Sequence, residues 1–113
     1  MLDAALLAVA DPTRRAICQR LAHGRATVGQ LAALFPISRP AVSQHLRVLL
    51  DAGLIRRTDS GRQSPYELSP VPLLEIEAWA RSVAAAWQGA PLPAPATYRE
   101  ERDVRAEPGR SER

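Results

Sequence analysis

Apolar residues recur at helical spacing in several short runs of this chain. In the first clear run, Ile17 and Leu21 share one face. Asp11 stands directly before a proline, which is the usual order of a capping residue and the first helical position. The pattern predicts a helix over 12–23, ended by Gly24.

Two further helices are predicted on either side of a tight turn. Thr27 begins a capping-box pattern, and Phe35-Pro36 closes this short helix after about two turns. Ser38 caps the second helix, which spans 38–52, and Gly53 follows as a left-handed terminal residue. In this second helix the apolar side chains form one stripe for the core, made of Val42, Leu46, Leu49 and Leu50.

Strand-forming residues replace the helical pattern over 54–68, where a Gly-containing turn at 59–61 predicts a hairpin and Pro65 places its second strand at an edge. A last helix is predicted over 73–88, with apolar positions at coiled-coil spacing. With a first apolar stripe near the start of the chain, the pattern predicts a mainly α fold of about five helices with a small β-hairpin. Two helices joined by a tight turn and followed by a hairpin form a winged helix-turn-helix.

The end of the chain differs in composition. Residues 89–113 begin Gly-Ala-Pro-Leu-Pro-Ala-Pro, continue with balanced charges and contain few large aliphatic side chains. We therefore expect a flexible or disordered tail after a folded domain over 1–88. A domain of that size barely supports one core, so a partner subunit would help to stabilise it.

The basic charge is concentrated in the predicted helix-turn-helix and hairpin. The chain carries a net charge of +3, and every one of its 15 basic residues is Arg. Between residues 12 and 62 the local charge is +7, which indicates a surface for phosphate. The nine arginines of this segment are Arg14, Arg15, Arg20, Arg25, Arg39, Arg47, Arg56, Arg57 and Arg62.

The side of helix 38–52 opposite its apolar stripe carries residue types that read DNA. Arg pairs with guanine, Gln with adenine, and Ser with phosphates or base edges. The outward residues are Arg39, Pro40, Ser43, Gln44 and Arg47. In the hairpin, Arg56, Arg57 and Arg62 are expected to lie along the DNA backbone or reach a minor groove.

Several function classes lack support. We see no signal peptide or membrane-spanning segment, and we expect a cytoplasmic protein that makes no membrane contact. One cysteine and two histidines cannot assemble a four-ligand zinc site, and no glycine-rich nucleotide fingerprint occurs. Ser43 and His45 are two residues apart on one helix, which cannot pair them as nucleophile and base. We therefore expect that this chain is not an enzyme and that it binds neither a cofactor nor a metal.

Three stretches resemble the ArsR/SmtB family of bacterial winged-helix repressors: 10–17, 28–32 and, most specifically, 37–55. The resemblance implies a homodimer built from the first and last helices, which binds an imperfect palindrome in double-stranded DNA and blocks transcription until a signal releases it. It also implies DNA contacts from Ser38, Ser43, Gln44 and His45, although periodicity places His45 nearer the helix flank.

The chain departs from the metal-sensing members of this family. Those members carry a cysteine pair in the helix before the reading helix, where this sequence has Val28–Leu31. Here the last helix offers Glu75, Glu77 and Arg81 as its charged groups, in place of Asp and His ligands. Cys18 is expected to pack as a small buried apolar residue. A metal-sensing role is therefore disfavoured, and the effector stays undefined.

The first and last helices supply candidate dimer contacts. Two tryptophans in a chain with five aromatic residues suggest an interface, although such a stripe could also close the core of one subunit. The candidate residues are Leu2, Leu6, Val9, Leu73, Ile76, Trp79, Ala80, Val83 and Trp87. An alternative function is a winged-helix module that contacts other proteins without binding specific DNA.

Overall fold

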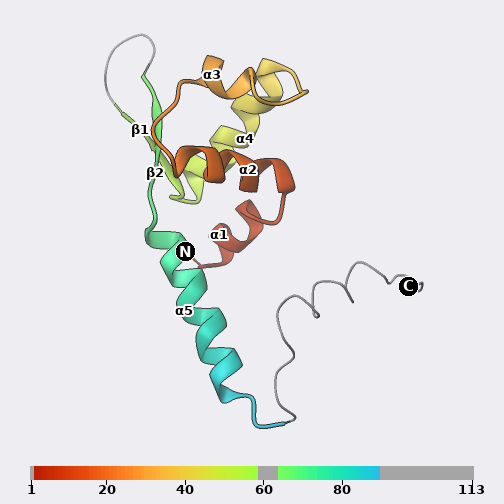
Figure 1. Cartoon of the computed structure of the whole chain (residues 1–113), viewed down its shortest axis with the longest axis vertical. Helices are drawn as coiled ribbons and strands as arrows, with labels where there is room; N and C mark the ends of the chain where they lie inside the picture. Colours follow the sequence, from red (N-terminus) through yellow and green to blue (C-terminus); the bar gives the residue numbers. More distant parts are fainter. Residues whose placement is uncertain (1, 59–63, 90–113) are drawn as a thin grey trace, which may run out of the picture.

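Helix α4 lies at the centre of a small helical body from which α5 extends (Figure 1). The computed structural model describes residues 2–58 and 64–89. Mainly helical, it has the predicted winged helix-turn-helix order. Its elements are α1 (Leu2–Ala8), α2 (Pro12–Leu21), α3 (Val28–Ala32), α4 (Arg39–Asp51), β1 (Ile55–Arg57), β2 (Tyr66–Leu68) and α5 (Val71–Ala86).

The predicted starts of α2 and α3 are confirmed by their caps. The Asp11 carboxylate accepts a hydrogen bond from the backbone N–H of Arg14 at 3.0 Å, which fixes the start of α2. Thr27 and Gln30 cap each other reciprocally at the start of α3. Helix α2 ends two residues before the predicted position 23, because Ala22 already forms its C-cap.

Both ends of α4 are fixed by local hydrogen bonds. The Ser38 hydroxyl accepts from the backbone N–H of Ala41 at 3.2 Å, as the sequence predicts. At the other end, Gly53 has a φ of 76°. Its N–H donates to Leu50 O, and the next N–H, of Leu54, donates to Leu49 O, both at 3.0 Å. These two hydrogen bonds end the helix, and the chain turns directly into β1.

The hairpin is tied to the helical body through Tyr66. Strands β1 and β2 are antiparallel, and Arg57 lies opposite Tyr66. On its other side Tyr66 exchanges two backbone hydrogen bonds with Ala26, at 2.8 and 3.0 Å. Strand β2 is an edge of this two-stranded sheet, as Pro65 predicts, and an isolated bridge to Ala26 gives Tyr66 a backbone partner on its outer side as well.

Helix α5 begins two residues before its predicted start at 73. Pro72 occupies its first turn, where a missing N–H costs no intrahelical hydrogen bond. The N–H of Leu74 donates to Pro70 O at 3.0 Å. The helix ends at Ala86, so the predicted end at 88 is two residues late.

One apolar cluster joins the first four helices and the hairpin. From α4 it takes Val42, Leu46 and Leu49, which are fully buried, whereas Leu50 packs against the cluster and stays partly exposed. The largest buried side chains outside α4 are Ile17, Leu31 and Leu54. Because α4 contacts α1, α2, α3 and β1, its apolar stripe holds the body together. The expected tail and the hairpin tip fall largely on residues 90–113 and 59–63, outside the described residues.

We predict that Thr27→Ala lowers the free energy of unfolding by about 1 kcal/mol, because it removes the acceptor that caps α3. Urea denaturation followed by circular dichroism measures the change. Thr27→Ser keeps a hydroxyl at the same place and should lose much less. Equal losses for both variants would contradict the capping role.

Candidate nucleic-acid interface

The polar row of α4 faces outward, as the sequence predicts. Its members Arg39, Pro40, Ser43, Gln44 and Arg47 are all exposed, while Val42 and Leu46 on the other side are buried. Ser43, Gln44 and Arg47 line one shallow hollow on the outer face. Three groups able to hydrogen-bond a base edge or phosphate therefore lie together on one helix face.

Ser38 and His45 lie differently from that row. Ser38 is exposed, but its hydroxyl already caps α4. The His45 side chain is 23% exposed, and its Nδ1 lies 3.3 Å from Nη1 of Arg14 and 4.0 Å from Oδ2 of Asp11. The ring is thus turned toward the start of α2.

The arginines counted as one basic footprint divide into two groups. Arg14, Arg15 and Arg20 donate to backbone carbonyl oxygens of their own α1–α3 region. Arg56 pairs with Glu67 across the hairpin at 3.1 Å, and Arg25 lies 3.7 Å from the other oxygen of that carboxylate. Five of the nine side chains are therefore already hydrogen-bonded or paired.

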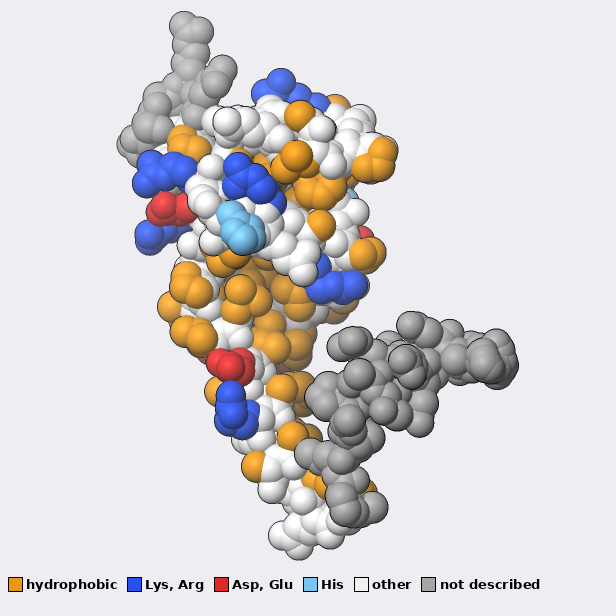
Figure 2. All heavy atoms as spheres, viewed as in Figure 1, with side chains coloured by type: hydrophobic (Ala, Val, Ile, Leu, Met, Phe, Trp, Pro, Cys, Tyr) orange, Lys and Arg blue, Asp and Glu red, His pale blue; other side chains and the backbone are white. Residues whose placement is uncertain are grey.

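Among the described residues, Arg39 and Arg47 form no ion pair, and Arg57 is held by an aromatic ring instead. The guanidinium of Arg57 lies 5.8 Å from the centroid of Tyr66, at cation–π distance. Since successive residues of a strand point to opposite faces, Arg57 and the Glu67-bound Arg56 face different ways. Arg62 lies outside the described residues. Figure 2 shows the basic side chains mostly over the helix-turn-helix and hairpin end of the molecule.

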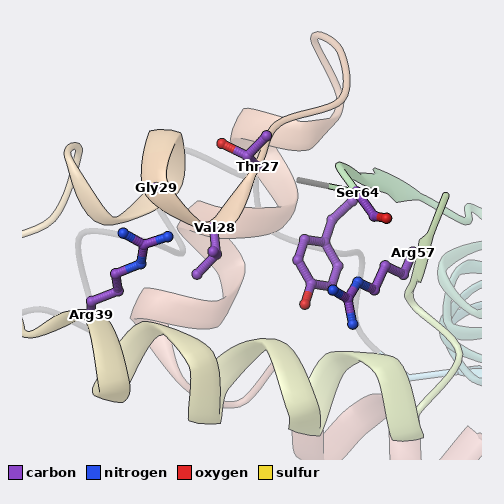
Figure 3. A pocket seen from close by; sticks show the side chains of 7 residues that line it. Thr27, Val28, Gly29, Arg39, Arg57 and Ser64 are labelled. Atoms are coloured by element: carbon purple, nitrogen blue, oxygen red, sulfur yellow. The ribbon is translucent and has the colours of Figure 1, made fainter. Parts of the chain in front are cut away.

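A polar cavity of about 200 Å³ joins the start of α4 to the hairpin. Figure 3 shows Arg39 and Arg57 at opposite ends of this cavity, with Val28 between them. Gly29 forms the wall near Arg39, where an added Cβ would lie 3.7 Å from its Nη2. The other lining residues are Thr27, Ser64 and Tyr66. Sequence reasoning missed Gly29 and Tyr66 because only the folded chain brings α3 beside the hairpin.

Cys18 is buried in the core at 8% exposure, as expected from the sequence. Burial raises the pKa of its thiol. The residue borders an apolar hollow of about 350 Å³ between α2 and the start of α5. Over the described parts of the chain, no group of three or more His, Cys, Asp or Glu side chains is placed to hold a metal ion.

The candidate dimer residues fall into two groups along α5. Leu73 and Ile76 are half-buried where α5 packs against α1, and Leu2, Leu6 and Val9 on the α1 side are half-buried too. Beyond that contact α5 continues away from the body (Figure 1), and its apolar stripe is exposed there. The exposed members are Trp79, Ala80, Val83 and Trp87.

This arrangement of α3, α4 and the hairpin is a winged helix-turn-helix, a class of DNA-binding fold. A family model described as a helix-turn-helix domain matches residues 9–58. The HTH-type transcriptional regulator Rv2034 of Mycobacterium tuberculosis is 51% identical over 74 residues, covering 66% of this chain and 69% of that protein. The transcriptional repressor SdpR of Bacillus subtilis is 38% identical over 72 residues, covering 64% of this chain and 80% of that protein.

A solved structure of similar fold is also that of a transcriptional regulator. The crystal structure of the ArsR family transcriptional regulator RHA00566 superposes with a TM-score of 0.72 at 36% identity, covering 79% of this chain and 98% of that one. The chain belongs to the ArsR/SmtB family of transcriptional regulators. Across the part of the chain that the structure describes, no helix is both long and apolar enough to cross a membrane.

We predict that iodoacetamide alkylates Cys18 at pH 8 at least roughly tenfold more slowly in the folded protein than in urea, because burial reduces access and raises the pKa. The unfolded chain also loses this proton at lower pH than the folded one, so stability falls as pH rises above the ordinary thiol pKa. Mass spectrometry measures the alkylation rates, and urea titrations at alkaline pH measure the free energy of unfolding. Cys18→Ala should remove this part of the pH dependence, and equal alkylation rates would contradict the burial.

Proposed function

We propose that this chain is a homodimeric transcriptional repressor that reads a palindromic operator through α4 and the hairpin. The observation that carries the proposal is the exposed row Arg39, Ser43, Gln44 and Arg47, held outward by the buried stripe of the same helix. The name of SdpR as a repressor supports repression as the direction of control.

Helix α4 enters the major groove with its N-terminal half in this proposal. Gln44 makes paired hydrogen bonds to an adenine, while Arg39 and Arg47 contact guanine or phosphate. Pro40 packs against the backbone, and the hydroxyls of Ser38 and Ser43 bind phosphate oxygens. His45 supports this surface from behind, since its ring is turned toward α2.

The hairpin supplies backbone contacts beside α4. Arg57 and Arg39 stand at the two ends of the cavity between the hairpin and α4, so DNA phosphates along the cavity mouth would meet a guanidinium group at each end. Arg56 is already paired with Glu67 and contributes less. Arg62 is assigned here from the sequence only.

Dimerisation uses α1 and α5. Large apolar side chains on α5 and at its C-cap are left in contact with water, with Trp79 at 49% and Trp87 at 59% exposure. A second copy would cover this stripe, as interfaces rich in aromatic side chains do. Glu75 on the same helix also has a buried Oε1 that finds no hydrogen-bond partner among the described residues. Two-fold pairing would place two copies of α4 about one DNA turn, near 10 base pairs, apart.

Gln44→Ala is predicted to weaken operator binding by about 1–3 kcal/mol and to relax preference at one base pair. Selection from random duplexes, followed by fluorescence anisotropy on the selected site, measures both effects. Gln19→Ala removes the same side chain from the exposed face of α2 and should change neither. A wild-type protein that prefers no duplex over random DNA would refute the proposed function and favour a protein-binding module.

Arg57→Gln should weaken binding to all duplexes alike and reduce the log–log salt slope by roughly 0.9, since one phosphate contact is lost. Arg56→Gln is the matched variant and should have the smaller effect, because Glu67 already holds that side chain. Anisotropy titrations over a range of salt concentrations compare the two. The opposite order would contradict the assignment of Arg57.

Ala80→Glu is expected to shift the protein from dimer to monomer, because it places a charge in the exposed apolar stripe of α5. Ala85→Glu makes the same change on the opposite side of the helix and should leave the dimer intact. Sedimentation velocity at micromolar concentration measures the assembly. A dimer that tolerates Ala80→Glu would show that this stripe is not the interface.

A further inference from the structure

Arg14 joins the last turn of α1 to the middle of α4. Its Nε donates to Ala8 O at 2.7 Å and its Nη2 donates to Leu7 O at 3.2 Å. Its Nη1 reaches Nδ1 of His45 at 3.3 Å. One guanidinium therefore contacts a proposed interface helix and the proposed reading helix at the same time.

The α1 side of this bridge suits a cation. The last carbonyl groups of a helix have no intrahelical donor, and they carry the negative end of the helix dipole. Leu7 and Ala8 belong to that last turn, and the planar guanidinium bonds both oxygens, of which Leu7 O also accepts the N–H of Ala10 at 3.2 Å.

The α4 side requires a defined form of His45. Arg can only donate, so the contact is a hydrogen bond when Nδ1 of His45 is the acceptor and the ring proton lies on Nε2. Asp11 completes the group: it accepts the backbone N–H of Arg14, and this bond is the main cause that holds the pKa of Asp11 below its ordinary value. Its Oδ2 lies 4.0 Å from His45.

Apolar packing leaves space between the two helices at this point. A hollow of about 360 Å³ lies between α1 and α4, lined by Ala4, Leu7, Ala8, Arg14, Val48, Asp51 and Ala52. Leu7, which borders it, is 72% exposed. Because side chains do not fill this hollow, the hydrogen bonds of Arg14 are the polar contacts that link α1 to α4 beside it.

We infer that Arg14 is a positioning residue. Through His45 it sets the orientation of the reading helix α4 relative to the interface helix α1, so that the two copies of α4 in a dimer meet both half-sites of the operator at once. The inference rests on the proposed function, since it explains how dimer geometry reaches DNA. It also gives His45 a role other than direct DNA contact, and it removes Arg14 from the phosphate-binding set.

A double-mutant cycle tests the bridge, with operator affinity measured for wild type, Arg14→Met, His45→Leu and the double variant. Each single change should weaken binding by about tenfold, and the double should also lose about tenfold, because all three break the same link. His45→Asn keeps an acceptor near the Nδ1 position and should restore most of the affinity.

Arg15→Met is the matched control, because Arg15 also donates to a backbone carbonyl, Val9 O at 2.8 Å, yet makes no hydrogen bond to α4 among those of the described residues. It should bind the operator like wild type. Sedimentation and circular dichroism verify that each variant is a folded dimer. If Arg14→Met fails to fold, Arg14→Gln takes its place in the cycle.

Two results would overturn the bridge: operator affinity unchanged in Arg14→Met, or losses that multiply to about a hundredfold in the double variant, as for independent DNA contacts.

A wild-type protein without operator binding refutes the proposed function instead. In that case spin labels at Ala4→Cys and Gln44→Cys, in Cys18→Ala protein diluted with unlabelled chains, decide the matter. Arg14→Met should broaden the distance between them, and an unchanged distance would overturn the bridge.

Discussion

Burial of the apolar stripe of α4 is the constraint on which the rest of the structure depends. Val42, Leu46 and Leu49 are in contact with no water, and the helix packs against α1, α2, α3 and β1. Rotating α4 about its axis would expose this stripe, at a cost of roughly 1.5–3 kcal/mol for each large side chain. The direction in which Gln44 and Arg47 point is therefore set by hydrophobic packing.

Local sequence signals predicted most of the fold because they act between close neighbours in the chain. The caps at Asp11, Thr27 and Ser38 are side chains that bond backbone groups three residues on. The left-handed Gly53 likewise acts within one turn. Helix ends without such a signal were less well placed, as the start of α5 shows: prolines in a first turn permit a helix but do not fix its first residue.

The sequence predicts which residue types the candidate site presents, but not which groups each of its side chains contacts. Periodicity separates the outward row of α4 from the core correctly, since both follow from one helix. Charge counting could not tell Arg57 from Arg56, or Arg14 from Arg39, because the difference lies in which carbonyl, carboxylate or ring each meets after folding. The role of His45 depended in the same way on a residue 31 positions away.

The backbone pairing of Tyr66 with Ala26 has a mechanical consequence. It joins the hairpin to the segment that leads into α3, so two backbone hydrogen bonds restrain the hairpin against the helix-turn-helix. The backbone at Arg57 is thereby tied to the helices that carry the α4 row. Under the proposed function, adjustment would then fall to the nucleic acid, whose flexible pyrimidine–purine steps yield more readily than stiff A-tracts. Base sequences that neither element touches would thereby influence which sites are occupied.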